Sequence, residues 1–215
     1  MKRTTRRFRD LMTKFIRFRG SADYWEKRYR MGGTSGRGSY DEEADFKADF
    51  LNAFVRDEGI GSVIEFGCGD GNQLSYLDFP SYTGLDVSHK AVEMCRNAFG
   101  SDTSKKFLHI SEYSGEKAGL SLSLDVIFHL VEDGVFHEYM QNVFRASEKY
   151  VIVYSTNSTE VNRQDQSHVR HRQFTSWLEK NIPEFELLQE RKTEGIQDRT
   201  SALKSFFVYR KKELS

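Results

Sequence analysis

The chain has 215 residues, a length that suits one α/β domain with additions. A hydrophobic content of 38% with only 2 prolines argues against global disorder. The 32 basic and 32 acidic residues cancel, so binding to nucleic acid through overall charge is not expected. Two cysteines, Cys68 and Cys95, give neither a disulfide framework nor a zinc-ligand spacing, so we expect a cytoplasmic protein without a metal. No apolar stretch approaches the ~18 residues of a membrane span.

Residues 1–20 form a basic amphipathic arm that differs from the rest of the chain. The arm holds eight lysines and arginines and one acid, which leaves a net charge of +7. Its apolar residues recur at helical spacing and lie on one face: Phe8, Leu11, Met12, Phe15 and Ile16. Such a helix suits the inner face of an anionic membrane, and it is equally compatible with docking on its own domain or on a second subunit. A transit peptide or a nucleic-acid contact is a weaker alternative.

Residues 21–58 are predicted to form an N-terminal helical lid. A helix begins around Asp23, with Ser21 or Asp23 as its cap, and ends in a loop with four glycines between residues 32 and 38. Such a loop is either a plain linker or a lid that becomes ordered when a ligand binds. Apolar side chains at helical spacing then predict an amphipathic helix over residues 41–57.

The central pattern is a short apolar strand followed by a glycine-rich turn. Residues 63–66 read as a buried strand, Gly67, Gly69 and Gly71 follow, and a helix is expected from Asn72. A second strand, residues 82–86, ends in Asp86, whose carboxylate is able to accept both hydroxyls of a ribose. The third glycine comes one residue too early for a dinucleotide fingerprint, and Asp70 would repel a pyrophosphate.

The remaining elements alternate between strands and helices. Ser88 is a natural N-cap for the helix that runs to Phe99. Further strands are expected at residues 107–110, 120–124, 150–155, 187–188 and 205–209, with helices at 135–146 and around Trp177. The last two strands are expected to pair as an antiparallel hairpin.

The glycine loop, Asp86 and the strand ending Leu122-Ser123-Leu124-Asp125 together resemble class I S-adenosylmethionine (SAM) dependent methyltransferases. The resemblance covers residues 60–156. It implies a Rossmann-like, seven-stranded, mostly parallel sheet with an antiparallel C-terminal strand, flanked by helices, and a SAM-binding domain over residues 59–215. The cofactor contacts that it implies are Trp25, Arg28, Glu65, Gly67, Cys68, Gly69, Asp70, Asp86, Val87, Glu112, Leu124 and Asp125.

Two sets of residues are candidates for the acceptor side. His129 follows the fourth strand and is either a general base, because a neutral histidine suits proton removal near neutral pH, or a structural residue. A cationic cluster is either an anchor for a phosphate or carboxylate on the acceptor or a solvated helix start. This cluster consists of His168, Arg170, His171 and Arg172.

More loosely, the Tyr24-Trp25 segment, the residues from His129 to Asp133 and the cationic cluster resemble small bacterial methyltransferases of surface-polysaccharide biosynthesis. This resemblance implies O-methylation of a sugar or a phosphorylated sugar-like acceptor, either a small molecule or a glycan. The alternatives are an RNA or protein methyltransferase, for which the basic arm is the only support, and a SAM-binding protein without turnover.

Overall fold

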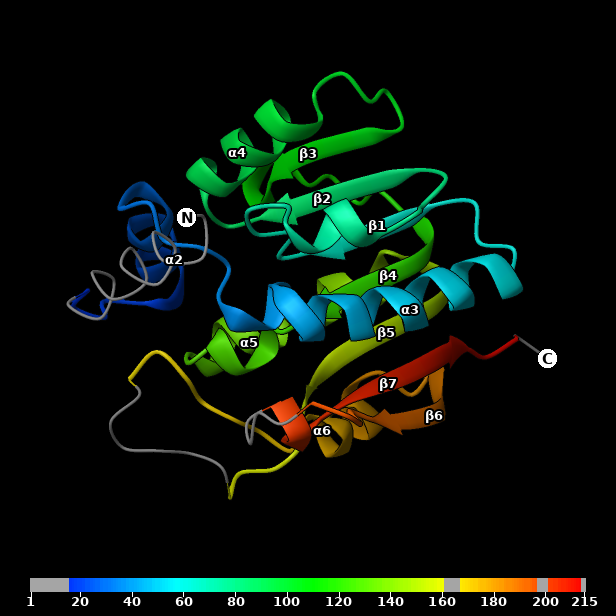
Figure 1. The fold of residues 1–215 in the computed structure, drawn as a ribbon. Helices are drawn as coiled ribbons and strands as arrows, with labels where there is room; N and C mark the ends of the chain where they lie inside the picture. Colours follow the sequence, from blue (N-terminus) through cyan, green and yellow to red (C-terminus); the bar gives the residue numbers. More distant parts are fainter. Residues whose placement is uncertain (1–15, 161–166, 197–200, 214–215) are drawn as a thin grey trace.

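The computed structural model describes residues 16–160, 167–196 and 201–213. The arm expected over residues 1–20 therefore lies largely outside the described residues. Within the described ranges, seven strands form one sheet in the order β3-β2-β1-β4-β5-β7-β6. The first five pair in parallel, and β7 runs antiparallel to both β5 and β6. This confirms the predicted mixed sheet and its C-terminal hairpin (Figure 1).

The strand bounds follow the predicted apolar runs, with most strands longer by a few residues. The strands are β1 (Val63–Phe66), β2 (Tyr82–Asp86), β3 (Lys105–His109), β4 (Ala118–Leu124), β5 (Ser147–Thr156), β6 (Phe185–Lys192) and β7 (Lys204–Lys211). Along β5, residues 150, 152 and 154 join one core cluster, whereas residues 151 and 153 join the other. This alternation shows that β5 is covered on both faces, as its continuous apolar run predicts.

The helices are α2 (Ser21–Arg30), α3 (Asp41–Asp57), α4 (His89–Phe99), α5 (Asp133–Arg145) and α6 (Phe174–Asn181). Apolar residues of α3 and α4 pack into the core cluster on one face of the sheet, and those of α5 and α6 into the cluster on the other. Short 3₁₀ turns lie between them: η2 (Arg37–Ser39), η3 (Gln73–Tyr76), η4 (Ile110–Glu112), η5 (Ile127–His129) and η6 (Ser201–Leu203).

The N-terminal segment divides into two parts with different roles in the fold. Helix α3 packs into the core through Leu51 and Val55 and belongs to the layer on the sheet. Helix α2 and the loop after it lie instead beyond the carboxyl ends of the parallel strands (Figure 1). Residues 21–40 therefore lie over this edge of the sheet, and residues 31–40 are called the lid loop below; that residues 21–58 act together as a lid stays a prediction.

Two local predictions are wrong. The helix expected from Asn72 is only the single turn η3, because α3 already covers this face and Asn52 bonds the main chain at Tyr76 and Asp78. Helix α2 begins at Ser21 with Gly20 at its N-cap and no side-chain cap. The N-cap predicted at Ser88 is confirmed, since its hydroxyl accepts a hydrogen bond from the Ala91 N–H. Within the described residues, no helix is long and apolar enough to cross a membrane.

Candidate functional site

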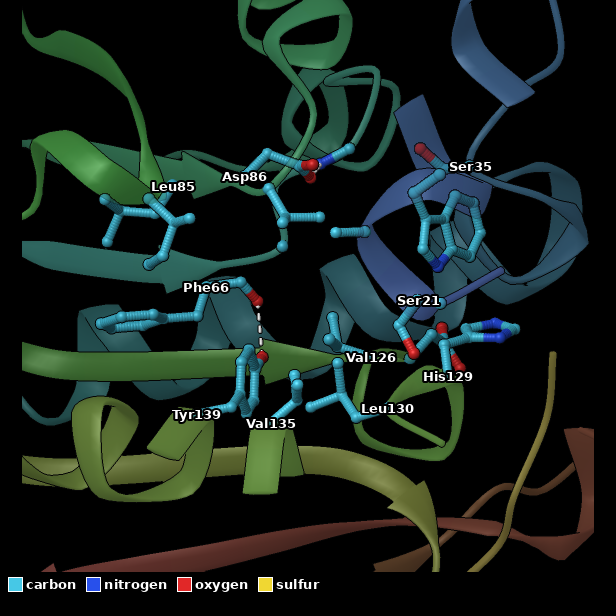
Figure 2. Close-up of a pocket in the computed structure, with 18 of the residues that line it drawn as sticks. Ser21, Ser35, Phe66, Leu85, Asp86, Val126, His129, Leu130, Val135 and Tyr139 are labelled. Atoms are coloured by element: carbon cyan, nitrogen blue, oxygen red, sulfur yellow. Dashed lines mark hydrogen bonds between the residues drawn. The ribbon is translucent and has the colours of Figure 1, made fainter. Parts of the chain in front are cut away.

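A cavity of about 490 Å³ lies at the carboxyl ends of β1, β2 and β4, beneath α2. Ligands of open parallel sheets bind at this edge. Figure 2 shows Asp86 and Leu85 on one side of the cavity and Leu130, Val135 and Tyr139 on the other. Among the predicted site residues, those lining it are Trp25, Gly67, Gly69, Asp86, Val87, Leu124, Asp125 and His129.

The turn between β1 and η3 needs glycine at two positions that line the cavity. Gly67 has φ +88 and Gly69 has φ +59, values at which an L side chain is strained. A Cβ at Gly67 would lie 2.4 Å from Cγ2 of Val126, and one at Gly69 would lie 2.2 Å from Oγ of Ser35. The two glycines therefore allow Val126, in the loop after β4, and Ser35, in the loop after α2, to contact the turn directly.

Asp86 places a buried carboxylate at the end of β2. Its Oδ2 accepts a hydrogen bond from the Gly69 N–H at 2.9 Å, and its Oδ1 accepts one from the Ser88 N–H at 2.8 Å. The side chain is buried and still lines the cavity. Burial raises the pKa of Asp86 to about 6, against hydrogen bonds from Ser88 and Gly69 that lower it. Each carboxylate oxygen keeps a second lone pair, so Asp86 is able to accept further hydrogen bonds, for example from hydroxyl groups.

Helix α2 is fastened across the cavity at two points. Near its start, the Ser21 N–H and hydroxyl donate to the Glu132 carboxylate at 2.9 and 2.6 Å. On its other side, Glu26 accepts hydrogen bonds from the Ser88 hydroxyl at 2.6 Å and the Lys90 N–H at 3.2 Å. The first contact ties α2 to the β4–α5 loop and the second ties it to the start of α4. The helix therefore bridges the two halves of the sheet over the site.

Asp70 binds the lid loop rather than the cavity. Its carboxylate accepts hydrogen bonds from the Ser35 N–H at 2.9 Å, the Ser35 hydroxyl at 2.8 Å and the Tyr40 hydroxyl at 2.7 Å. The hydroxyl of Ser35 also contacts that of buried Tyr29 at 3.1 Å. The resemblance implied that Asp70 contacts the cofactor. In the structure its carboxylate oxygens instead accept hydrogen bonds from Ser35 and Tyr40.

His129 lies in the wall of the cavity among aromatic rings. Trp25 meets it edge to face at 4.9 Å between ring centres, and Phe128 lies at 4.5 Å. Its Nδ1 is 3.3 Å from the carbonyl oxygen of His168, which fixes Nδ1 as the donor and leaves the lone pair of a neutral ring on Nε2. Burial lowers the pKa of His129 to about 3. The ring is therefore neutral at physiological pH.

Asp125 lies at the end of β4, in the cavity wall, with both carboxylate oxygens bound by lysines. Lys47 of α3 donates to Oδ2 at 2.7 Å and Lys204 of β7 donates to Oδ1 at 2.6 Å. Burial raises the pKa of this carboxyl, but Lys204 and Lys47 outweigh burial and lower the pKa to about 2. Asp125 is therefore a fixed anion and not a base.

Besides Asp70, four predicted cofactor residues do not line the cavity. Glu65 accepts a hydrogen bond from the buried Tyr82 hydroxyl, and burial raises its pKa to about 7. The Cys68 side chain is buried against Gly84 of β2. Glu112 accepts a hydrogen bond from the His109 N–H at 2.7 Å and closes the η4 turn, so Ile110 lines the cavity in its place.

The fourth is Arg28. Its Nε donates to the Thr34 carbonyl at 2.6 Å, within the lid, and its guanidinium lies 5.6 Å from the Trp25 ring centre. Arg28 therefore supports the fold of the lid and the orientation of Trp25, and the cavity wall is formed by Trp25 itself.

The predicted cationic cluster is not brought to the cavity. Arg172 donates to the carbonyls of Leu130 at 2.6 Å and Val131 at 2.9 Å, and to Asp133 at 3.0 Å. Arg170 lies 2.9 Å from Asp133 and also donates to the Val131 carbonyl. These guanidiniums hold the loop between β4 and α5, which explains why basic residues stand in this segment.

The two histidines of the cluster also have structural contacts. His171 is buried, with Nδ1 2.6 Å from the Thr156 hydroxyl oxygen. The His168 ring stacks on Tyr24 at 4.5 Å, and its carbonyl accepts the hydrogen bond from His129. His168 therefore lies behind the cavity wall, where it contacts both His129 and Tyr24 of α2.

Several lining residues were not anticipated from the sequence. Tyr29 and Ser35 come from the lid, and Tyr139 comes from α5, where its hydroxyl donates to the Phe66 carbonyl at 2.8 Å (Figure 2). The only available sequence signal was that Tyr139 is a polar-tipped aromatic on an otherwise apolar helix face. In the parts of the chain that the structure describes, no group of three His, Cys, Asp or Glu side chains could hold a metal ion.

No protein-family model matches the sequence, and no curated protein does. Solved structures do resemble it. The N-methyltransferase NodS from Bradyrhizobium japonicum WM9, in complex with S-adenosyl-L-homocysteine, is 12% identical with a TM-score of 0.68, covering 90% of this chain and 100% of that one. Magnesium protoporphyrin IX methyltransferase (ChlM) from Synechocystis PCC 6803, with the same product bound, is 15% identical with a TM-score of 0.61, covering 89% and 98%.

The methyltransferase domain of bacterial CtHen1-C is 20% identical with a TM-score of 0.61, covering 77% of this chain and 97% of that one. Sequence identities this low establish a shared fold and not a shared activity. The strand order, the antiparallel β7 and these likenesses agree on one architecture. The chain has the Rossmann-like fold of the class I SAM-dependent methyltransferases.

Proposed function

We propose that the chain is a SAM-dependent methyltransferase. The observation that carries this proposal is the buried Asp86 carboxylate, which lines a covered cavity and is held by the N–H of the glycine loop beside it. Asp86 would accept the ribose hydroxyls, and Val87 and Leu124 would contact the adenosine part. Gly67 and Asp125 would lie at the methionine part. SAM supplies the methyl group on a sulfonium that is already a good leaving group.

The residues of the chain align the acceptor and exclude water. Helix α2 covers the cavity, so a bound acceptor is shielded from solvent. His129 is the proposed catalytic residue: its Nε2 lone pair would accept a hydrogen bond from the acceptor hydroxyl and orient it towards the methyl carbon. A pKa of about 3 makes His129 a weak base, so it would first orient the hydroxyl and would accept the hydroxyl proton only as the bond to the methyl carbon forms and the oxygen becomes strongly acidic.

We propose a small acceptor, because the cavity lies beneath α2 and is bordered by the tether between Ser21 and Glu132. O-methylation of a sugar or sugar-like molecule remains the proposal that the sequence resemblance supports. Arg170 and Arg172 were expected to bind a phosphate on that acceptor, but they bind loop carbonyls and Asp133. We therefore no longer propose that these arginines bind the acceptor.

RNA is the second candidate acceptor. Its support is the likeness in fold to a small RNA methyltransferase, HEN1, which is 17% identical with a TM-score of 0.59, together with the basic composition of residues 1–20. The covered cavity favours the small molecule.

The test has a binding arm and a transfer arm. Calorimetry with SAM compares the wild type with Asp86→Ala and with Asp57→Ala, a control whose side chain is 65% exposed on α3. We expect at least a tenfold loss of affinity for Asp86→Ala and none for Asp57→Ala. Labelled methyl from SAM is then followed into fractionated cell extract. Label in sugar or nucleotide-sugar fractions supports the small acceptor, and label in RNA refutes it.

Two further outcomes of this test are decisive. Wild-type protein that does not bind SAM would refute the proposal. Wild-type protein that binds SAM but labels no fraction would favour a SAM-binding protein without turnover.

A further inference from the structure

Four charged side chains are buried together beside the cavity. Lys47 is 1% exposed, Glu43 4%, Lys204 6% and Asp125 13%. They come from α3, from the end of β4 and from the start of β7. Lys204 binds both Glu43 and Asp125, Lys47 binds the second oxygen of Asp125, and the Ser201 hydroxyl donates to Glu43. The two ammonium groups and two carboxylates sum to zero charge.

A contribution to stability does not by itself explain why these four charges are buried together. Removing charges from water costs free energy that their mutual attraction repays only with good geometry, and apolar replacements of similar volume are often as stable. The rings of Tyr154 and Phe128 already border Lys204 and would complete an apolar core with an apolar side chain at that position. The network is therefore better explained if the charges hold one of the four side chains in a fixed position.

The member whose placement affects the cavity is Asp125. It has φ +60, one of two positive values among the described non-glycine residues. The next residue, Val126, packs on Gly67, and the η5 turn that carries His129 follows directly. On the lid side, a Cβ at Gly38 would lie 2.7 Å from Oδ2 of Asp125, so the lid loop rests on the same carboxylate.

We propose that Lys204 and Lys47 are positioning residues for SAM binding: each holds one oxygen of Asp125, and together they fix the carboxylate and the turn that bears Val126 and His129 against the glycine loop. The inference rests on the proposed function. It assigns a part of the cofactor site to β7 in the C-terminal hairpin, 79 positions from Asp125 along the chain.

A single substitution would confuse positioning with stability, so the test uses a charge-balanced pair. Lys204→Met leaves the buried Glu43 carboxylate without its lysine partner, whereas the double variant Glu43→Gln with Lys204→Met removes one charge of each sign. Lys211→Met, at the exposed end of the same strand, is the control. Each full-length variant is examined by thermal unfolding and by calorimetry with SAM.

We expect Lys204→Met to lower both the melting temperature and the affinity for SAM. In the double variant the melting temperature recovers, but the affinity for SAM stays at least tenfold below that of the wild type, because Asp125 still lacks one of its two holders. Lys211→Met should match the wild type in both. Recovery of both quantities in the double variant would show a structural role only and overturn the inference.

If either methionine variant fails to fold, Lys204→Arg decides the question. It keeps the positive charge, but a planar guanidinium does not place its donors where a compact ammonium bridges Glu43 and Asp125. Positioning predicts a several-fold loss of SAM affinity in a folded protein, and unchanged affinity overturns the inference. Wild-type protein without SAM affinity would instead refute the proposed function itself.

Discussion

Replacing Gly69 with alanine tests whether the lid loop depends on the glycine turn. Two costs are expected. The first is conformational: at φ +59, an L residue costs about 1–2 kcal/mol. The second is steric, since the new Cβ would lie 2.2 Å from Oγ and 3.2 Å from Cβ of Ser35, and 3.0 Å from the Tyr29 hydroxyl oxygen. Ser35 must therefore move away.

Moving Ser35 breaks its hydrogen bonds with Asp70. The Ser35 hydroxyl donates to the Asp70 carboxylate at 2.8 Å and accepts from the Asp70 N–H at 2.9 Å. A hydrogen bond to a charged group contributes about 1.5–3 kcal/mol. With the conformational cost of about 1–2 kcal/mol, Gly69→Ala should lower the free energy of unfolding by about 2.5–5 kcal/mol.

Gly59 provides a control for the conformational cost alone. It has φ +61, and nothing lies within 4 Å of a Cβ built there. Gly59→Ala should therefore cost only about 1–2 kcal/mol. Urea unfolding of both variants gives the difference, which measures the contact with the lid loop.

A double-mutant cycle with Ser35→Gly isolates the clash further. Ser35→Gly removes the two Ser35 atoms that lie 2.2 and 3.2 Å from the new Cβ and leaves only the Tyr29 hydroxyl oxygen, at 3.0 Å, close to it. Gly69→Ala should therefore cost less in that background, approaching the value of Gly59→Ala. Equal losses for Gly69→Ala and Gly59→Ala in the wild-type background, or strictly additive losses in the cycle, would refute the reasoning.

Three further predictions concern the site. Burial holds the pKa of Asp86 at about 6, above its ordinary value of 3.8, so the carboxylate takes up a proton as pH falls through 6. SAM affinity should therefore drop about tenfold between pH 7 and pH 5. A SAM affinity that calorimetry finds unchanged over this pH range would contradict the prediction. For the same reason, the destabilising cost of the buried charge is present above pH 6 and is relieved as pH falls towards 4. Arg172→Met should lower the free energy of unfolding, measured in urea, by about 2–3 kcal/mol, because the Arg172 side chain is 13% exposed and donates to two carbonyls. Arg170→Met, at a side chain 45% exposed, should lower it by less than about 1 kcal/mol. Similar losses for the two variants would contradict this difference. Glu132→Ala removes the acceptor for Ser21 and should speed SAM release in stopped-flow measurements about fivefold or more, and an unchanged rate would show that this tether does not hold the lid.

The sequence by itself determined the parts of this protein whose physics is local. The apolar run of residues 63–66 followed by glycines predicts a strand and a tight turn, and the structure has β1 ending at Phe66 with positive φ at Gly67, Gly69 and Gly71. The strand ending at Asp86 lies where the spacing predicts. Strand alternation and helix periodicity depend on neighbouring residues, so a single sequence is enough to read them.

Only the tertiary structure decided which polar side chains are engaged, and by which partners. Lys47 and Lys204 reach Asp125 from 78 and 79 positions away, and Asp70 is bound by a serine 35 positions earlier. The composition of the cationic cluster suggested anion binding, yet Arg172 is held by carbonyls of a loop about 40 residues before it. A charged residue type specifies what chemistry is available, but its partner is set by how distant segments pack, which no local pattern records.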